Sequence, residues 1–265
     1  MKLHWPAARH LYLSPHPDDV VLSCGGMIWE QVQRGETVAV VTVFVDSPSP
    51  SLKLSDFAQS LHDRWRASAS NAGDFPDPPA LRRAEDAKSL AILDSRITLS
   101  QFPLTDCIYR THPFTDQPLY ASEESLFGEV DPADPALEKL SIIPPPGEGM
   151  LIYSPLSIGH HIDHQILRSI VDGWGLDAAR VRYYEDYPHV VIHSNLQQIV
   201  GQHNGWVPHV MPLSEAALKA KIKAAAQHHS QISTFWQSVD AMDQAVRGYA
   251  SSVGGERLWI QAGRP

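Results

Sequence analysis

Cysteine and basic residues are both scarce in this chain of 265 residues. The two cysteines, Cys24 and Cys107, are too few for a disulfide framework, and the amino terminus lacks the long apolar stretch of a signal peptide. Lys and Arg total 21 against 30 Asp and Glu, so the formal net charge is −9. These absences favour a reducing cytoplasm and argue against nucleic acid or an anionic membrane as a partner.

Long apolar runs are absent too. No stretch approaches the roughly 18 uninterrupted apolar residues of a membrane-spanning helix. The 21 prolines and 16 glycines are spread along the chain rather than gathered in one linker, and no internal repeat is visible. We therefore expect a single domain over residues 1–265 that acts on a small molecule. Homo-oligomerisation stays open.

Short buried runs and amphipathic stretches alternate along the sequence. Runs rich in β-branched residues predict strands, and apolar residues three or four apart predict helices. The expected strands are 10–14, 37–45, 96–102, 150–153, 181–184 and 256–260. The expected helices are 20–34, 54–72, 79–93, 122–140, 163–174, 214–235 and 240–250. This alternation predicts an α/β fold, a three-layer α/β/α Rossmann-like domain with a mostly parallel sheet.

The run Ser14-Pro15-His16-Pro17-Asp18-Asp19 directly follows the first expected strand. Open α/β sheets bind their ligands outside the carboxyl ends of the strands. Imidazole nitrogen and carboxylate oxygen are both good zinc ligands, at about 2.0–2.2 Å. Alone, however, the run is equally consistent with a turn and a helix cap, because Pro favours turns and Asp caps helices.

A second run, Gly159-His160-His161-Ile162-Asp163-His164, follows a later strand and opens a helix. His161 and His164 are three residues apart, so on a helix they share one face. Because parallel strands end at one edge of a sheet, the two runs can converge although about 145 residues separate them. Together they predict a metal site, for zinc or another divalent ion such as Fe²⁺.

Both runs resemble motifs of the PIG-L/LmbE-like zinc deacetylases, which remove the acetyl group from N-acetylglucosaminyl conjugates. The family's His-Pro-Asp-Asp and His-x-Asp-His blocks are intact here. Arg82-x-x-Glu85 looks like the family's Arg-x-x-Glu helix, and residues 221–231 look like its Lys-x-x-Ala-x-x-x-His-x-Ser-Gln helix. The loop that begins at Asp46 departs from the family's glutamate-containing loop, so no substrate contact is carried over there.

The resemblance implies a role for each motif residue. It implies that the zinc ligands are His16, Asp19 and His164. Asp18 would be the general base, and His161 the general acid or oxyanion stabiliser. Asp163 would orient an imidazole. We expect Asp163 to raise the pKa of His161 by favouring its cation, which would keep this acid charged near neutral pH.

Arg82 and Glu185 are the candidate substrate contacts. Arg82 can bind substrate oxygens, but it lies three residues before Glu85, so a solvated ion pair on a helix is equally consistent. Glu185 follows a strand within Tyr184–Tyr187, which either rims the pocket or forms a plain polar loop.

These features predict a zinc-dependent hydrolase that removes an N-acetyl group from an N-acetylglucosaminyl-type conjugate or another amino-sugar small molecule. The reaction class follows from the site, whereas the acetylated sugar follows only from the resemblance. One alternative is an amidase acting on a larger thiol- or antibiotic-type conjugate. Another is a non-catalytic sugar- or nucleotide-binding protein, although the chain has no Gly-x-Gly-x-x-Gly or Walker-type loop.

Overall fold

A computed structural model describes residues 4–69, 75, 77–193, 195–201 and 205–262. Its strands are β1 (His10–Ser14), β2 (Val38–Asp46), β3 (Thr98–Thr105), β4 (Leu151–Pro155), β5 (Val181–Tyr184), β6 (Trp206–Met211) and β7 (Glu256–Gln261). Within the described residues they form one sheet in the order β3-β2-β1-β4-β5-β7-β6. Strands β1 to β5 run parallel, and β6 and β7 add an antiparallel edge. The predicted mostly parallel sheet is therefore confirmed.

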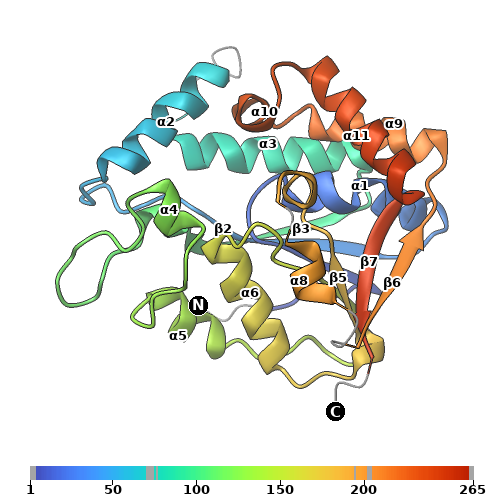
Figure 1. The fold of residues 1–265 in the computed structure, drawn as a ribbon, viewed down its shortest axis with the longest axis horizontal. Helices are drawn as coiled ribbons and strands as arrows, with labels where there is room; N and C mark the ends of the chain where they lie inside the picture. The colour runs from blue at the N-terminus through green and yellow to red at the C-terminus, as the bar shows by residue number, and fades with distance from the viewer. Residues whose placement is uncertain (1–3, 70–74, 76, 194, 202–204, 263–265) are drawn as a thin grey trace.

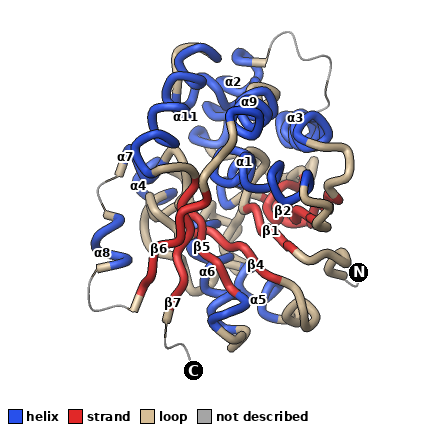
Figure 2. The backbone as a smooth tube through the Cα atoms, turned by 90° about the vertical axis from the view of Figure 1, so that its right-hand side faces the viewer, coloured by secondary structure: helices blue, strands red, loops and turns tan. Residues whose placement is uncertain are grey.

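Helices cover both faces of this sheet. They are α1 (Asp19–Gln33), α2 (Asp56–Ser68), α3 (Pro78–Leu93), α4 (Glu123–Leu126), α5 (Pro135–Ser141), α6 (Ile162–Gly173), α7 (His189–Ile192), α8 (Leu196–Val200), α9 (Glu215–Ala225), α10 (His229–Phe235) and α11 (Val239–Val253). Helices α1, α3, α9 and α11 lie over one face, and α5 and α6 lie under the other (Figures 1 and 2). This is the three-layer arrangement that the sequence predicts.

The side chains of each strand point alternately to the two faces of the sheet, so the core consists of one cluster on each face. Leu11 and Leu13 of β1 belong to the cluster that α5 and α6 cover, whereas Tyr12 belongs to the cluster under α1 and α9. Successive strand residues point to opposite faces, and both faces of a central parallel strand are buried. The nearly unbroken apolar sequence of β2 has the same cause, since its residues 38–45 are all buried.

Several predicted elements differ from the observed ones. The helix expected over 122–140 is two short helices, α4 and α5, because Asp134 and Pro135 start a new helix. The helix expected over 214–235 is interrupted at His228, where the backbone leaves helical geometry between α9 and α10. Strand β6 was not predicted, because it lies at the sheet edge with mostly exposed residues and so shows no alternating pattern. None of the described helices is long and apolar enough to cross a membrane.

A buried ion pair ties α1, α9 and β7 together. The Lys221 ammonium lies 2.7 Å from a carboxylate oxygen of Glu256, and both side chains are buried. Glu256 also accepts hydrogen bonds from the backbone N–H groups of Gly26 and Met27, at 2.9 and 2.7 Å. Gly26 also packs closely, because a Cβ at this position would lie 2.6 Å from a terminal methyl group of Leu213 and would require that side chain to shift.

Replacing Lys221 by Met should therefore destabilise the fold. The variant leaves the Glu256 carboxylate buried without its cation, and breaking such a pair costs about 3–5 kcal/mol. Urea denaturation measures the change. Lys219→Met is the matched control on the same helix, since the ammonium of Lys219 is largely exposed and should contribute little. Equal unfolding midpoints for the two variants would contradict this role of the pair.

Candidate active site

The two His/Asp motifs meet at the point where the chain changes direction across the sheet. From β1 the chain runs outward through β2 and β3, and then returns to place β4 on the other side of β1. The first motif leaves the carboxyl end of β1, and the second leaves that of β4. Loops that diverge from two neighbouring parallel strands open a crevice between them, where open α/β sheets bind ligands.

The backbone of the first motif is held in an uncommon shape. Asp18 caps α1 at a φ of 92°, a region that non-glycine residues rarely occupy. Such a conformation costs about 1–3 kcal/mol, and it persists only where the surroundings enforce it. The Ser14 hydroxyl supports the loop by donating to the carbonyl of His16 at 2.6 Å and accepting from the N–H of Val20 at 3.2 Å. These two hydrogen bonds hold the backbone of the loop that places Asp18 and Asp19.

One carboxylate oxygen of Asp19 faces an imidazole nitrogen from each of the two motifs in this crevice. Oδ2 of Asp19 lies 3.3 Å from Nδ1 of His16 and 3.3 Å from Nε2 of His164. Two tetrahedral ligands that each lie about 2.0–2.1 Å from a zinc ion are separated by about 3.3 Å. The spacing of these donors therefore fits the ion that the sequence predicts.

The outer nitrogens of both imidazoles are bound to carboxylates. His16 Nε2 donates to Oδ2 of Asp163 at 2.9 Å, and His164 Nδ1 donates to Oδ1 of Asp186 at 2.6 Å. Histidines that bind metals usually have such a partner, because it fixes the ring and its tautomer. The hydrogen then sits on the outer nitrogen, so the inner nitrogen can offer its lone pair.

Buried negative charge dominates the site. The carboxylates are Asp18, Asp19, Asp106, Asp163 and Asp186, and the guanidinium groups among them are Arg82 and Arg110. Burial disfavours an imidazolium, yet the nearby carboxylates raise the pKa of His16 to about 9 and that of His164 well above its ordinary value. The excess negative charge that holds protons on these rings is what a divalent cation would neutralise.

His161 is another possible ligand. His16, His161 and His164 bring ring nitrogens within 4.8 Å of one another, and Cys107, His161 and Asp163 also lie this close. However, Nδ1 of His161 already accepts the backbone N–H of Asp163 at 3.2 Å, where it caps α6. Oδ2 of Asp19 also accepts a backbone N–H, that of His16 at 2.8 Å, but a carboxylate oxygen has a second lone pair whereas an imidazole nitrogen has only one. Asp19 therefore has the better claim as third ligand, because this oxygen also faces both other donors.

The predicted link between Asp163 and His161 is wrong. The Asp163 carboxylate accepts from His16 and from the backbone of Cys107, and it forms an ion pair with Arg110 at 2.6 Å. Burial, and then the charges of His16 and His164, lower the pKa of His161 well below its ordinary value. A pKa lowered in this way favours the neutral form of His161 over the imidazolium. Because Nδ1 accepts the helix N–H, its hydrogen belongs on Nε2.

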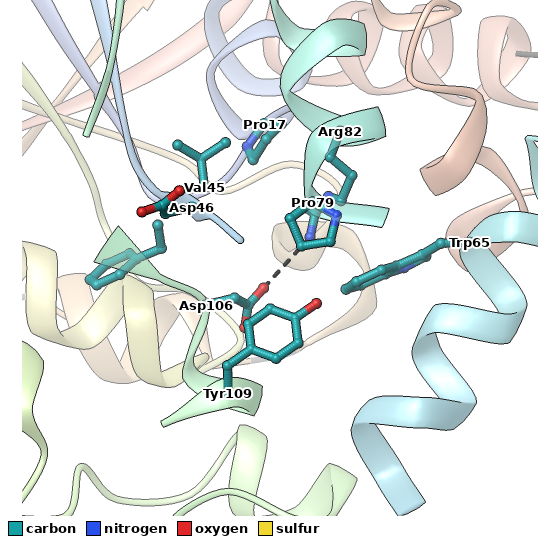
Figure 3. A pocket seen from close by; sticks show the side chains of 9 residues that line it. Pro17, Val45, Asp46, Trp65, Pro79, Arg82, Asp106 and Tyr109 are labelled. Carbon is teal, nitrogen blue, oxygen red and sulfur yellow. Dashed lines mark ion pairs between the residues drawn. The ribbon is translucent and has the colours of Figure 1, made fainter. Parts of the chain in front are cut away.

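Arg82 joins the site rather than a solvated helix pair. Its guanidinium lies 3.7 Å from Asp18 and 3.5 Å from Asp106, stacks over Trp65, and is only 7% exposed (Figure 3). Its Nε has no hydrogen-bond partner among the described residues. Glu85, the alternative partner, instead accepts the N–H and hydroxyl of Ser230. Arg82 therefore has unused donor capacity at the site.

The structure also adds residues that the sequence analysis missed. Asp106 follows the carboxyl end of β3, which is the one signal that could have identified it. Arg110 lies in the next turn and forms an ion pair with Asp163, while Asp134 holds it from behind at 2.9 Å. Tyr120 in turn donates to Asp134 at 2.8 Å. A continuous chain of buried polar contacts thus supports His16 through its partner Asp163.

Glu185 does not face the site. Its carboxylate accepts from Arg257 and Trp259 at 2.6 and 2.7 Å and is also bound by Tyr249, and it does not line the cavity. The expectation that Glu185 contacts the substrate is therefore not supported. Its neighbour Asp186 points the other way, to His164.

Two hollows lie beside these residues. A cavity of about 710 Å³ opens over His16, Asp18 and His164. A pocket of about 10 Å³, roughly the size of one water molecule, lies behind Arg82 and Asp106 (Figure 3). The space behind Arg82 and Asp106 is therefore far smaller than the cavity over the two histidines.

Comparisons with known proteins agree with this architecture. The family model described as "PIG-L: GlcNAc-PI de-N-acetylase" matches residues 11–174. The 2'-N-acetylparomamine deacetylase of Niallia circulans is 28% identical over 215 residues, which are 74% of this chain and 71% of that protein. The zinc-inhibited form of teicoplanin deacetylase Orf2 has a TM-score of 0.73 at 26% identity, covering 97% of this chain and 100% of the other. A deacetylase–teicoplanin complex has a TM-score of 0.71 at 27% identity, covering 95% and 97%.

The family match spans more than half of the chain, and both His/Asp motifs lie within it. The similar structures extend over nearly the whole chain. This chain therefore belongs to the PIG-L family.

Proposed function

We propose that this chain is a zinc-dependent deacetylase that hydrolyses the N-acetyl amide of an amino sugar. The observation that carries the proposal is the convergence of His16, His164 and Asp19 on one point, with Asp18 facing the same cavity. Similar proteins named as deacetylases of 2'-N-acetylparomamine and of teicoplanin support the bond and the substrate type. A lone sugar-binding role would not require this set of metal donors.

His16, Asp19 and His164 would hold the ion. When bound there, zinc supplies Lewis acidity to the amide carbonyl and to the attacking water. Asp163 and Asp186 keep the two imidazoles in the orientation and tautomer that binding needs.

Asp18 is suited to carry the proton. Burial, and then the charge of Asp19, raise the pKa of Asp18 far above that of an ordinary carboxyl, toward the range where a general base works best. The Asp18 carboxylate takes a proton from the water that attacks the carbonyl carbon. It then returns this proton to the amide nitrogen as the C–N bond breaks, which leaves acetate and the free amine.

His161 is suited to stabilise the oxyanion. The Nε2–H of its neutral ring can donate a hydrogen bond to the carbonyl oxygen as negative charge develops there. This role needs no protonated imidazole, and so differs from the charged acid predicted from the sequence.

Arg82 and Asp106 are suited to hold the sugar ring. One offers guanidinium N–H donors and the other offers carboxylate acceptors, so together they match the hydroxyl next to the acylated amine. The nearly filled space behind them leaves room for a hydroxyl but for nothing larger.

The product released from model substrates tests the proposal directly. Acetate released from N-acetylglucosaminides by the zinc-loaded protein is the expected result. A larger carboxylic acid released from a thiol-type conjugate, with no acetate from the sugars, would favour the amidase. Sugar binding with no hydrolysis would favour the binding protein.

Replacing Asp18 by Asn should remove activity without removing the metal. The amide cannot take the proton of the attacking water, so kcat should fall by about 10²–10⁴-fold. Metal analysis should still find one zinc per chain, since Asp18 is not in the ligand set. Unchanged turnover would exclude Asp18 as the base.

Replacing His164 by Ala should remove a ligand. Zinc stoichiometry measured after dialysis should fall well below one, because two protein donors remain. Tight stoichiometric zinc in this variant would remove His164 from the ligand set.

Replacing Asp186 by Asn should weaken zinc binding while leaving the ligands in place. Loss of such a carboxylate partner typically lowers metal affinity 10–100-fold, which competition with a chelator measures. Asp177→Asn is the control, because Asp177 is exposed and only caps a short helical turn. Equal zinc affinities for the two variants would argue against the role of Asp186.

A further inference from the structure

The large cavity has two chemically different parts. One set of its lining residues consists of the charged groups and histidines described above. A second set is apolar and comes from four separate segments; we call it the outer wall, and it consists of Phe57, Leu61, Leu126, Phe127, Ile192 and Phe235. The segments are α2, α4 with the residue after it, α7 and α10.

Leu61 belongs to the buried core, but the other outer-wall side chains do not. Phe57, Leu126, Phe127 and Phe235 are only partly buried, and Ile192 is 58% exposed. A ligand that covers such apolar surface is stabilised by removing it from water. Clustered exposure of this kind is typical of binding sites.

Aromatic rings connect the outer wall with the reacting centre. The ring of Phe127 lies 5.6 Å from that of His161 and 6.1 Å from that of His189. His189 in turn lies 5.7 Å from Phe235. A substrate group attached close to the scissile amide can therefore contact these aromatic rings.

The shape of the site decides which part of the substrate reaches this surface. In a 2-acylamino sugar, the carbon that bears the amide lies between a hydroxyl-bearing carbon and the anomeric carbon. If the hydroxyl side faces Arg82 and Asp106, the pocket of about 10 Å³ behind them leaves no room there for a large substituent. The anomeric substituent then extends into the larger cavity, which the outer wall lines.

Charge among the remaining lining residues is balanced. Apart from the Asp residues and Arg82 described above, the Lys, Arg, Asp and Glu side chains that line the cavity are Arg64 and Glu123, one cation and one anion. A polycationic aglycone would find no excess of carboxylates to bind. A flat apolar group, by contrast, matches the rings of Phe127 and Phe235.

From this geometry we infer that the outer wall is an aglycone subsite for an apolar, aromatic group linked to the anomeric carbon of the N-acetylated sugar. This inference rests on the proposed deacetylation and adds the class of conjugate. The cavity of about 710 Å³ lies in the 300–1,000 Å³ range of sites for drug-sized ligands, and a single sugar leaves much of it empty.

The experiment compares three substrate sets with the zinc-loaded protein. The first pairs methyl and naphthyl β-glycosides of N-acetylglucosamine. The second extends the acyl group of methyl glucosaminide from acetyl to octanoyl. The third is an N-acetylated aminocyclitol glycoside with further amino groups. We expect kcat/KM for the naphthyl glycoside to exceed that for the methyl glycoside by about tenfold or more, with no gain from a longer acyl chain or from added cations.

Two variants test the residues. Phe127→Ala and Phe235→Ala should bring the naphthyl-to-methyl ratio of kcat/KM close to one. Phe114→Ala should keep the wild-type ratio, because this equally aromatic side chain is 89% exposed and does not line the cavity.

Each of the other possible results would overturn a different part of the proposal. Acetate release with a ratio near one in the wild type would exclude the aglycone subsite and leave the deacetylase intact. A preference for long acyl chains that Phe127→Ala removes would assign the outer wall to the acyl group. A preference for the cationic glycoside would exclude an apolar conjugate. No acetate from any substrate would overturn the proposed function itself.

Discussion

The largely buried carboxylate of Asp19 is the group around which the site is organised; its side chain is 14% exposed. One of its oxygens lies 3.3 Å from an imidazole nitrogen in the loop after β1 and 3.3 Å from another in the first turn of α6. A carboxylate so far removed from water is tolerated only with compensating charge and hydrogen bonds. Here two imidazoles face it, and each is held from behind by a further carboxylate, Asp163 or Asp186. The whole cluster therefore carries an excess of negative charge that suits a divalent cation.

Support for this cluster extends well into the protein. Asp163 would itself be an uncompensated buried charge without Arg110, whose guanidinium bridges it to Asp134. The phenol of Tyr120 completes the series. Every member of this chain of four residues is buried and is held by contacts on two sides. The orientation of His16 therefore depends on the whole chain. The turn-rich segment after β3 is thus a structural part of the candidate metal site.

Sequence reasoning identified the parts that show a local pattern. His16, Asp18, Asp19, His161 and His164 stand in dense runs next to strands, so their convergence follows from the geometry of a parallel sheet. Single polar residues such as Asp106 and Asp186 show no such pattern, because only tertiary structure brings them to the site. Whether Glu185 or Asp186 faces the site depends on which way each side chain leaves the end of β5. The charge state of His161 likewise depends on burial, and its sequence neighbour Asp163 turned out to serve His16.

The fold also separates the chemistry of the site from its choice of conjugate. The donor residues lie where the chain passes from β1 into α1 and from β4 into α6, and these two strands are neighbours at the centre of the sheet. The outer wall comes instead from α2, α4, α7 and α10, which lie farther along the connections. Substitutions in these segments can change the shape and polarity of the outer cavity without moving a metal ligand, because rigid strands hold the ligands while the connecting segments vary. Changes in these segments would then alter which conjugate the proposed deacetylase accepts and leave the His and Asp arrangement in place.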